Sequence, residues 1–141
     1  MASVDGPGKR VLVVEDDRDI REGLQEFLRE EGYEVSVAEN GQQAIDMLDE
    51  TGPAVILLDL MMPIMDGYTF LATIRTASSG RHAHIPVVLI TAAGEKARTV
   101  AATQVAEVVP KPIDLDKLLA AISRHRGQLP NVPGQSSPTG S

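Results

Sequence analysis

The hydrophobic residues fall into short apolar runs that alternate along the chain with segments of helical periodicity. Three uninterrupted runs, at residues 11–14, 55–58 and 87–90, are too short for ordinary helices. Apolar runs without polar alternation are typical of strands that are buried on both faces of a sheet. Residues 33–38 alternate between apolar and polar, as a half-covered edge strand does, and residues 107–110 predict a short fifth strand.

Helical patterns separate these strands. Apolar residues at Ile20, Leu24, Phe27 and Leu28 predict the first helix, with Asp17 as its N-cap. Three further helices are predicted around residues 40–49, 68–74 and 114–126, and a weak small-residue stripe lies at residues 95–104. We expect two apolar stripes to face the core: Tyr68, Phe70, Leu71 and Ile74 in one helix, and Leu115, Leu118, Leu119 and Ile122 in the last.

The strand–helix unit therefore occurs five times in succession. This order predicts an α/β fold: a doubly wound, five-stranded parallel sheet with helices on both faces and right-handed crossovers. We expect one domain over residues 10–126, a disordered N-terminal tail at residues 1–9, and a disordered tail or linker at residues 127–141, where Pro, Gly, Ser and Gln predominate.

Composition narrows the function classes. The 141 residues include no cysteine, which excludes disulfides, thiolate metal sites and thiol nucleophiles. The formal net charge of -7 disfavours direct binding to nucleic acid or to an anionic membrane. No apolar run approaches the about 20 residues that a membrane-spanning helix requires, and the expected location is the cytoplasm.

Polar residues stand at the carboxyl ends of four predicted strands. Glu15 and Asp16 follow the first strand, Asp59 the third, Thr91 the fourth and Lys111 the fifth. In an open parallel sheet these ends meet at one edge, where sites form near the switch point of the strand order. An aspartate after a strand is more often a turn or helix cap, but the other four residues favour a site.

This residue set predicts phosphoryl-transfer chemistry. Three crowded carboxylates repel one another and favour a cation, and all-oxygen ligands select Mg²⁺. A carboxylate can act as a nucleophile that accepts a phosphoryl group, and Asp59 is the best candidate because it follows the central buried strand. The Lys111 ammonium and the Thr91 hydroxyl would offset charge on the phosphoryl oxygens.

Five motifs in this order resemble the receiver domains of two-component response regulators, similar to the chemotaxis response regulator fold. The resemblance covers about residues 10–126 and implies a flavodoxin-like strand order, 2-1-3-4-5. The motifs are Glu15-Asp16 after two valines, Asp59 with Pro63 four residues later, Asp66-Gly67, Thr91-Ala92, and Lys111-Pro112.

The resemblance implies a role for each site residue. Asp59 would accept phosphate from a phosphohistidine on a sensor histidine kinase or phosphotransfer protein. Asp16 would bind Mg²⁺ directly and Glu15 through water, with Asp59 and the Met61 carbonyl completing the set. The remaining pair, Thr91 and Lys111, would contact the phosphoryl group, and the Lys111–Pro112 peptide would be cis.

Phosphorylation would then draw Thr91 toward the phosphate and reshape the surface of the fourth helix, fifth strand and fifth helix. That surface would serve a downstream effector or output domain, or a homodimer. Receivers usually carry an aromatic switch residue three positions before the lysine, where this chain has Val108. We therefore expect a relay by backbone and packing shifts without rotation of a ring.

Two residues flank the expected path to the phosphoryl group. Ala92 is small and leaves entry open. Met61 cannot orient an attacking water by hydrogen bonding, so we expect slow self-dephosphorylation.

Two other function classes compete with this interpretation. A receiver fold used only as a phosphorylation-independent interaction module would be compatible with Val108, but it has no need of the complete set of acids, Thr91 and Lys111. An enzyme such as an aspartyl phosphatase would require a second acid two residues after Asp59, where Met61 stands.

The remaining polar candidates have simpler roles. We expect His82, His84 and His125 to be solvated surface residues, and the Arg124-His125-Arg126 cluster to complement the dipole of the last helix.

Overall fold

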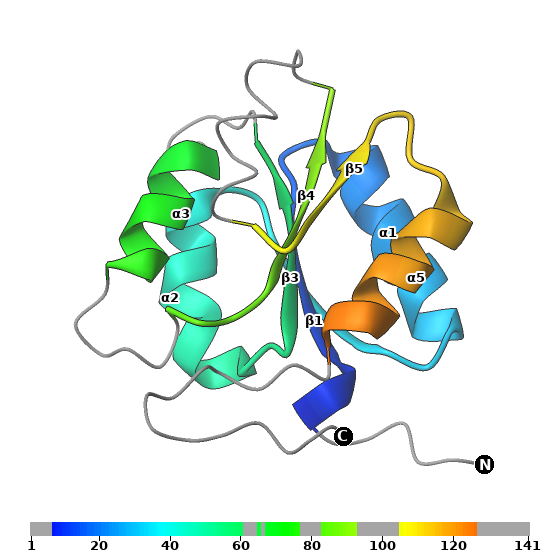
Figure 1. Ribbon diagram of the computed structural model, residues 1–141, viewed down its shortest axis with the longest axis horizontal. Coiled ribbons are helices and arrows are strands. Elements are labelled where there is room, and N and C mark those ends of the chain that lie inside the picture. Colours follow the sequence, from blue (N-terminus) through cyan, green and yellow to red (C-terminus); the bar gives the residue numbers. More distant parts are fainter. Residues whose placement is uncertain (1–6, 61–64, 66, 77–82, 93–104, 127–141) are drawn as a thin grey trace.

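The computed structural model describes residues 7–60, 65, 67–76, 83–92 and 105–126 (Figure 1). The strands are β1 (Arg10–Val14), β2 (Glu34–Ala38), β3 (Val55–Asp59), β4 (Val87–Thr91) and β5 (Glu107–Pro110). The helices are a short 3-10 turn η1 (Pro7–Lys9), α1 (Arg18–Glu30), α2 (Gly41–Thr51), α3 (Gly67–Arg75) and α5 (Leu115–His125). The weak stripe at residues 95–104 lies outside the described residues.

All five strands are parallel and follow the order β2-β1-β3-β4-β5, which confirms the predicted topology. Helices α2 and α3 cover one face of the sheet, while α1 and α5 cover the other (Figure 1). The carboxyl ends of the strands point toward one edge of the sheet, and η1 lies at the opposite edge. Within the described residues, no helix is both long enough and apolar enough to cross a bilayer.

Alternate residues along the inner strands supply two separate cores. Leu12 and Leu58 pack with Phe70 in the core beneath α2 and α3. Their neighbours Val13 and Leu57 lie in the core beneath α1 and α5. Both faces of β1, β3 and β4 are therefore buried, which explains why their sequences show no polar alternation.

The edge strand β2 is covered on only part of its surface, as its alternating sequence predicted. Val35 is buried, Glu34 is exposed, and Val37 is half-buried.

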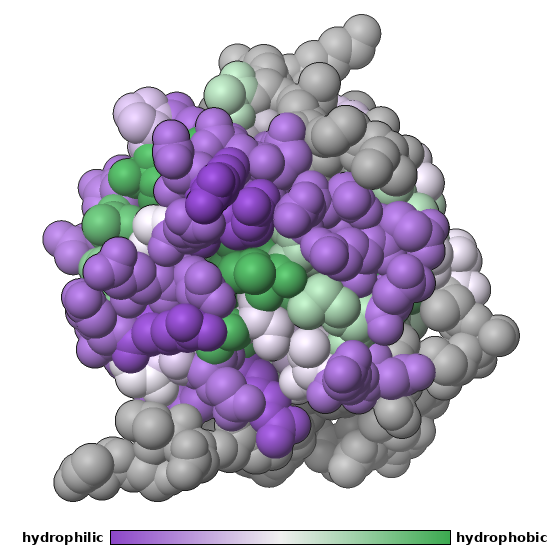
Figure 2. Space-filling model, turned by 180° about the vertical axis from the view of Figure 1, so that it is seen from behind, coloured by the Kyte–Doolittle hydropathy of each residue, from purple (hydrophilic) through white to green (hydrophobic). Residues whose placement is uncertain are grey.

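From behind, a small group of apolar side chains lies in the middle of the molecule and is surrounded by hydrophilic ones (Figure 2).

Side-chain caps begin α1, α2 and α5, and the cap of α1 is the predicted Asp17. Asp17 accepts a hydrogen bond from the amide of Ile20, and Asn40 and Asp114 cap α2 and α5 in the same way. At the end of α1 the chain turns through Gly32, whose φ is 96°. The amide of Gly32 donates to Arg29 and the next amide to Leu28, which is a Schellman ending.

Two predicted core residues are instead exposed. Tyr68 has 36% and Leu115 has 42% of its surface accessible. Tyr68 precedes Phe70 by two residues, a rotation of about 200° around a helix, so it faces away from the core. Leu115 is the first residue of α5 and lies in an exposed turn.

The end of α5 is tied down by specific pairs, so the prediction of a solvated His125 is wrong. Its Nε2 lies 3.0 Å from Oε1 of Glu107 in β5, and Arg124 pairs with the same carboxylate. The hydrogen bond from Arg124 holds the pKa of Glu107 below its usual value. Arg126 donates to the carbonyl of Gly8, 3.1 Å away, and so joins the end of α5 to the turn η1.

The start of α2 contacts the segment that follows β3. The amide of Gly41 donates to the carbonyl of Met65 at 3.3 Å. A Cβ on Gly41 would lie 2.8 Å from Cγ and 2.9 Å from the carbonyl oxygen of Met65. The absence of a side chain at Gly41 therefore lets α2 support the β3–α3 connection.

We predict opposite effects for two glycine-to-alanine substitutions. Gly41→Ala should lower the free energy of unfolding by about 1–3 kcal/mol, because the new methyl group overlaps Met65. Gly23→Ala, inside α1 with open space around it, should raise the free energy by up to about 1 kcal/mol. Urea denaturation of both variants measures the difference. Equal effects of the two substitutions would contradict the contact described for Gly41.

Candidate functional site

Strand register brings the predicted site residues to the same edge of the sheet. Asp59 is the last residue of β3, and Glu15 directly follows β1, whose end is paired with β3. Thr91 ends β4 opposite Pro110, and Lys111 is the next residue of the chain. The amide of Lys111 continues the ladder by donating to the carbonyl of Thr91 at 3.1 Å.

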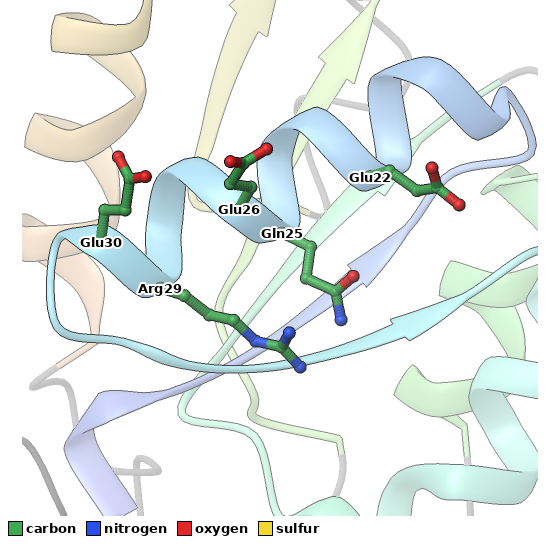
Figure 3. A pocket seen from close by; sticks show the side chains of 5 residues that line it. All are labelled: Glu22, Gln25, Glu26, Arg29 and Glu30. Carbon is green, nitrogen blue, oxygen red and sulfur yellow. The ribbon is translucent and has the colours of Figure 1, made fainter.

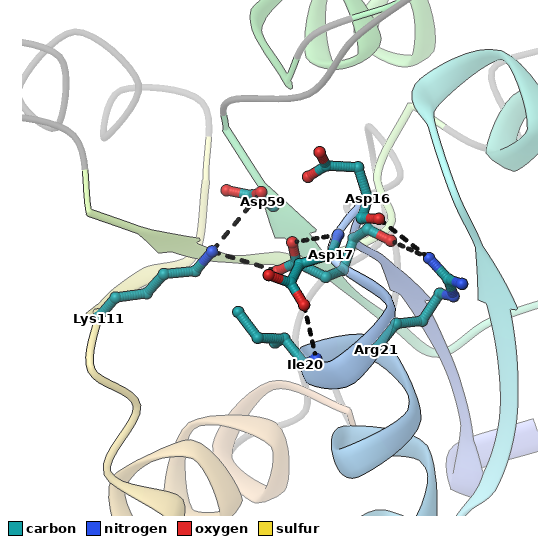
Figure 4. Close-up of polar contacts among 7 residues, drawn as sticks. Asp16, Asp17, Ile20, Arg21, Asp59 and Lys111 are labelled. Atoms are coloured by element: carbon teal, nitrogen blue, oxygen red, sulfur yellow. Dashed lines mark hydrogen bonds and ion pairs between the residues drawn. The ribbon is translucent and has the colours of Figure 1, made fainter.

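The charged side chains meet as the sequence predicted (Figure 4). Nζ of Lys111 lies 3.3 Å from Oε1 of Glu15 and 3.6 Å from Oδ2 of Asp59. Glu15 and Asp59 are buried, with 2% and 5% of their surface accessible, whereas Asp16 is exposed. One carboxylate oxygen from each of the three acids lies within 4.8 Å of the other two.

The side to which each site residue points follows from the alternation within its strand. Val13 and Leu57 belong to the core beneath α1 and α5, so Glu15 and Asp59, two residues later in each case, lie toward the same helices. Thr91 is buried and follows Ile90 of that core, so it lies toward the opposite face.

Burial disfavours the ionised form of Glu15. Loss of solvent raises the pKa of Glu15 from its ordinary value of 4.5 to about 7, and the nearby Asp59 carboxylate adds to this rise. The hydrogen bond from the amide of Asp17 and the charge of Lys111 act in the opposite direction.

The donor set fits a hard divalent cation. Oε1 of Glu15 is buried and accepts no hydrogen bond from the described residues, although Lys111 lies near it. The cluster offers carboxylate oxygens without histidine or cysteine, the ligand chemistry that Mg²⁺ prefers. The fourth predicted ligand, the carbonyl of Met61, lies outside the described residues.

Arg21 is a neighbour of the site that the sequence did not reveal. Its Nη1 donates to the carbonyls of Glu15, at 3.0 Å, and Asp16, at 3.3 Å (Figure 4). In the sequence, the contact is indicated only by the position of Arg21 in the first turns of the helix that Asp17 caps, within reach of the preceding loop.

An open hollow of about 470 Å³ adjoins the acidic cluster. It is lined by Ile20, Ala92, Lys111, Pro112 and Ile113. Lys111 therefore belongs both to the site and to a mostly apolar surface, and Ala92 lines the same hollow. The Lys111–Pro112 peptide is cis, as predicted.

A second hollow, on the outer face of α1, has different chemistry. It is lined by Glu22, Gln25, Glu26, Arg29 and Glu30, whose side chains point to two sides of the helix and do not converge (Figure 3). Because these side chains do not converge on a common point, we assign them to a solvated helix face.

The final switch prediction concerns Val108. This residue lies in β5 and is half-buried against the core beneath α2 and α3. It therefore occupies the same side of the sheet as Thr91.

Comparison with known proteins matches residues 11–123 to the response regulator receiver domain. The chain is 38% identical over 124 residues to response regulator protein FleR of Pseudomonas aeruginosa, covering 86% of this chain and 25% of FleR. It is 34% identical over 113 residues to response regulator MprA of Mycolicibacterium vanbaalenii, covering 79% of this chain and 47% of MprA. The chain thus spans a quarter to a half of the length of these relatives.

Solved structures agree with the fold. Response regulator TrrA of Thermotoga maritima, in complex with Mg²⁺ and BeF, has a TM-score of 0.72 and 32% identity, covering 82% of this chain and 97% of TrrA. The receiver domain of a signal transduction histidine kinase from Syntrophus aciditrophicus has a TM-score of 0.77 and 26% identity, covering 93% and 99% of the two chains.

We predict that Glu15 makes the metal-free protein less stable as the pH rises. The raised pKa means that the folded state holds a proton that the unfolded state releases as the pH rises. The stabilisation by this proton is therefore complete below about pH 4.5 and is lost by about pH 7. Glu15→Gln should remove this pH dependence and raise the free energy of unfolding at pH 8 by roughly 1–2 kcal/mol. This value is smaller than the pKa shift alone would give, because the nearby Lys111 already stabilises the ionised carboxylate. Urea denaturation in EDTA across this range measures the effect.

The control is Glu26→Gln, which removes one carboxylate from the exposed face of α1. Identical pH slopes for the wild type and Glu15→Gln would show that burial does not perturb Glu15.

Proposed function

The chain belongs to the response regulator receiver domain family, and we propose that its regulatory reaction is Mg²⁺-dependent transfer of a phosphoryl group from a phosphohistidine to Asp59. One observation carries the proposal. The carboxylate of Asp59 is buried at the end of the central strand, beside Lys111 and a second buried acid, Glu15.

In the proposed step an oxygen of Asp59 attacks phosphorus as the bond between phosphorus and the imidazole nitrogen breaks. The bonding electrons return to the imidazole, and Asp59 becomes an acyl phosphate. Lys111, already near the Asp59 oxygens, would offset charge on the phosphoryl group, and the Thr91 hydroxyl would donate a hydrogen bond to it. Mg²⁺, when bound, supplies further positive charge against the crowded oxygens.

The cation would be held by Asp16 directly and by Glu15 through water, with Asp59 and the carbonyl of Met61 as the remaining ligands. The arrangement of the three carboxylates supports this assignment. Their mutual repulsion and the raised pKa of Glu15 imply that protons compete with the cation for the site.

Access to Asp59 would pass Ala92 and Lys111. Both residues line the hollow beside the cluster, so a phosphohistidine donor would approach over a mostly apolar surface. Met61, the other proposed access residue, would leave an attacking water without a hydrogen-bond partner and so prolong the acyl phosphate.

The signal would leave the site through Thr91 and Val108. Both lie toward the same side of the sheet, and Val108 packs against the core with Val105. Movement of Thr91 toward a phosphoryl group would therefore alter packing at β5 without an aromatic ring. It would also change the surface formed by the fourth helix predicted at residues 95–104, β5 and α5. We propose this surface as the contact with an output domain, an effector or a second copy.

The proposed setting is a cytoplasmic domain of residues 10–126, flanked by tails at residues 1–9 and 127–141. The donor would be a sensor histidine kinase or a phosphotransfer protein. An interaction module that works without phosphorylation has no need of Lys111 between two buried acids, so we prefer the phosphorylated switch.

Asp59→Asn tests the acceptor. Incubated with acetyl phosphate and Mg²⁺, the wild type should gain one phosphoryl group that hydroxylamine removes, as measured by intact mass. Asp59→Asn should lose this uptake by roughly 100-fold or more, because the amide is a poor nucleophile. The control Asp46→Asn changes an exposed aspartate in α2. Undiminished labelling of Asp59→Asn would refute the proposed acceptor.

The relay can be read from methyl NMR signals. Addition of beryllofluoride and Mg²⁺ should shift the signals of Val108 in the wild type, and this shift should shrink strongly in Thr91→Ala. Val35, in the edge strand β2, should change little and serves as the internal control. Unmoved Val108 signals in a protein that binds beryllofluoride would contradict the packing relay.

A further inference from the structure

The side chain of Arg21 ties the first helix to the backbone of the acidic segment. One nitrogen of its guanidinium reaches back from α1 to the carbonyls of Glu15 and Asp16, at 3.0 and 3.3 Å. The contact is between a charged donor and two successive peptide groups, which is stronger than a neutral hydrogen bond.

The other contacts of this segment hold its ends. The amide of Glu15 donates to Ala38 at 3.0 Å, and the amide of Asp17 donates to Oε2 of Glu15 at 3.1 Å. Asp17 in turn caps α1. Between these anchors, the peptide that joins Glu15 to Asp16 is held by Arg21.

Two positively charged side chains thus contact the segment in different ways (Figure 4). Lys111 contacts the carboxylates of Glu15 and Asp59 themselves, whereas Arg21 hydrogen-bonds to the backbone carbonyls of the segment. A cation entering the carboxylate cluster would compete with Lys111. It would leave the carbonyls that Arg21 holds unchanged.

We propose that Arg21 is a positioning residue for the divalent-cation site. By fixing the Glu15–Asp16 peptide, it holds the two side chains in the directions that bring their oxygens near Asp59 before the cation binds. Because the backbone is already ordered, cation binding does not have to order it. The inference rests on the proposed function only for the identity of the cation as Mg²⁺.

Charge and positioning predict opposite effects on affinity. Removing a nearby positive charge would by itself tighten the binding of Mg²⁺. Removing the two hydrogen bonds would release the peptide and weaken binding. Arg21→Lys keeps the charge, but its ammonium ends one atom short of the position of Nη1 and so reaches the two carbonyls less well. Arg21→Met loses the charge and the hydrogen bonds together.

The experiment measures Mg²⁺ affinity of the unphosphorylated protein by titration calorimetry, and follows the Asp16 and Asp17 amide signals by NMR. We expect the wild type to bind most tightly, Arg21→Lys to be intermediate, and Arg21→Met to bind roughly tenfold more weakly than the wild type. In metal-free Arg21→Met, the two amides should exchange faster with solvent.

Arg75 provides a matched control. Its Nη1 also donates to two carbonyls, those of Ala83 and Ile85, each at 3.0 Å, before the amino end of β4 and thus at the opposite edge of the sheet. Arg75→Met should destabilise the fold without changing Mg²⁺ affinity. This variant separates positioning of the site from a general loss of stability.

Binding by Arg21→Met as tight as, or tighter than, binding by the wild type would overturn the inference. If Arg21→Met does not fold, an affinity of Arg21→Lys equal to that of the wild type would do the same. A wild type that takes up phosphate while Arg21→Met binds Mg²⁺ normally would refute only the role of Arg21. A wild type that binds no Mg²⁺ would refute the proposed metal site itself.

Discussion

The pair of buried carboxylates beside Lys111 is the interaction on which the rest of the structure depends. Burying Glu15 and Asp59 together is unfavourable, since both lose solvent and repel each other. Lys111 lies between them and offsets part of that cost. The remaining repulsion would favour a divalent cation at the cluster, so the electrostatic cost of burying the two acids and the proposed chemistry of the site have the same origin.

The sheet and its site could be predicted from the sequence because both follow from short-range patterns. Apolar runs buried on both faces identify the inner strands, and the polar residue after each run marks the edge where the site lies. The parallel order then requires Asp59 and Lys111 to meet, although they lie 52 positions apart in the sequence. The cap Asp17 was predictable for the same reason, since it acts on the next turn of the chain.

What the sequence did not reveal depends on contacts that leave no periodic pattern. Arg21 bonds to backbone carbonyls, which every residue possesses, so no partner residue type indicated its role. The position of His125 depends on Glu107, 18 residues earlier and in another element. The apolar ring of Tyr68 predicts a core position, but the phase of α3 turns it outward. Side-chain contacts between different elements could therefore be identified only from the folded structure.

The hydrogen bond between Arg126 and the carbonyl of Gly8 brings the two ends of the described part of the chain together. A segment joining these ends would need only a few residues and would leave the carboxyl edge of the sheet untouched. The domain therefore has the geometry of an insertable module: it can be placed within a loop of another chain, or reopened at a different connection, without stretching its sheet.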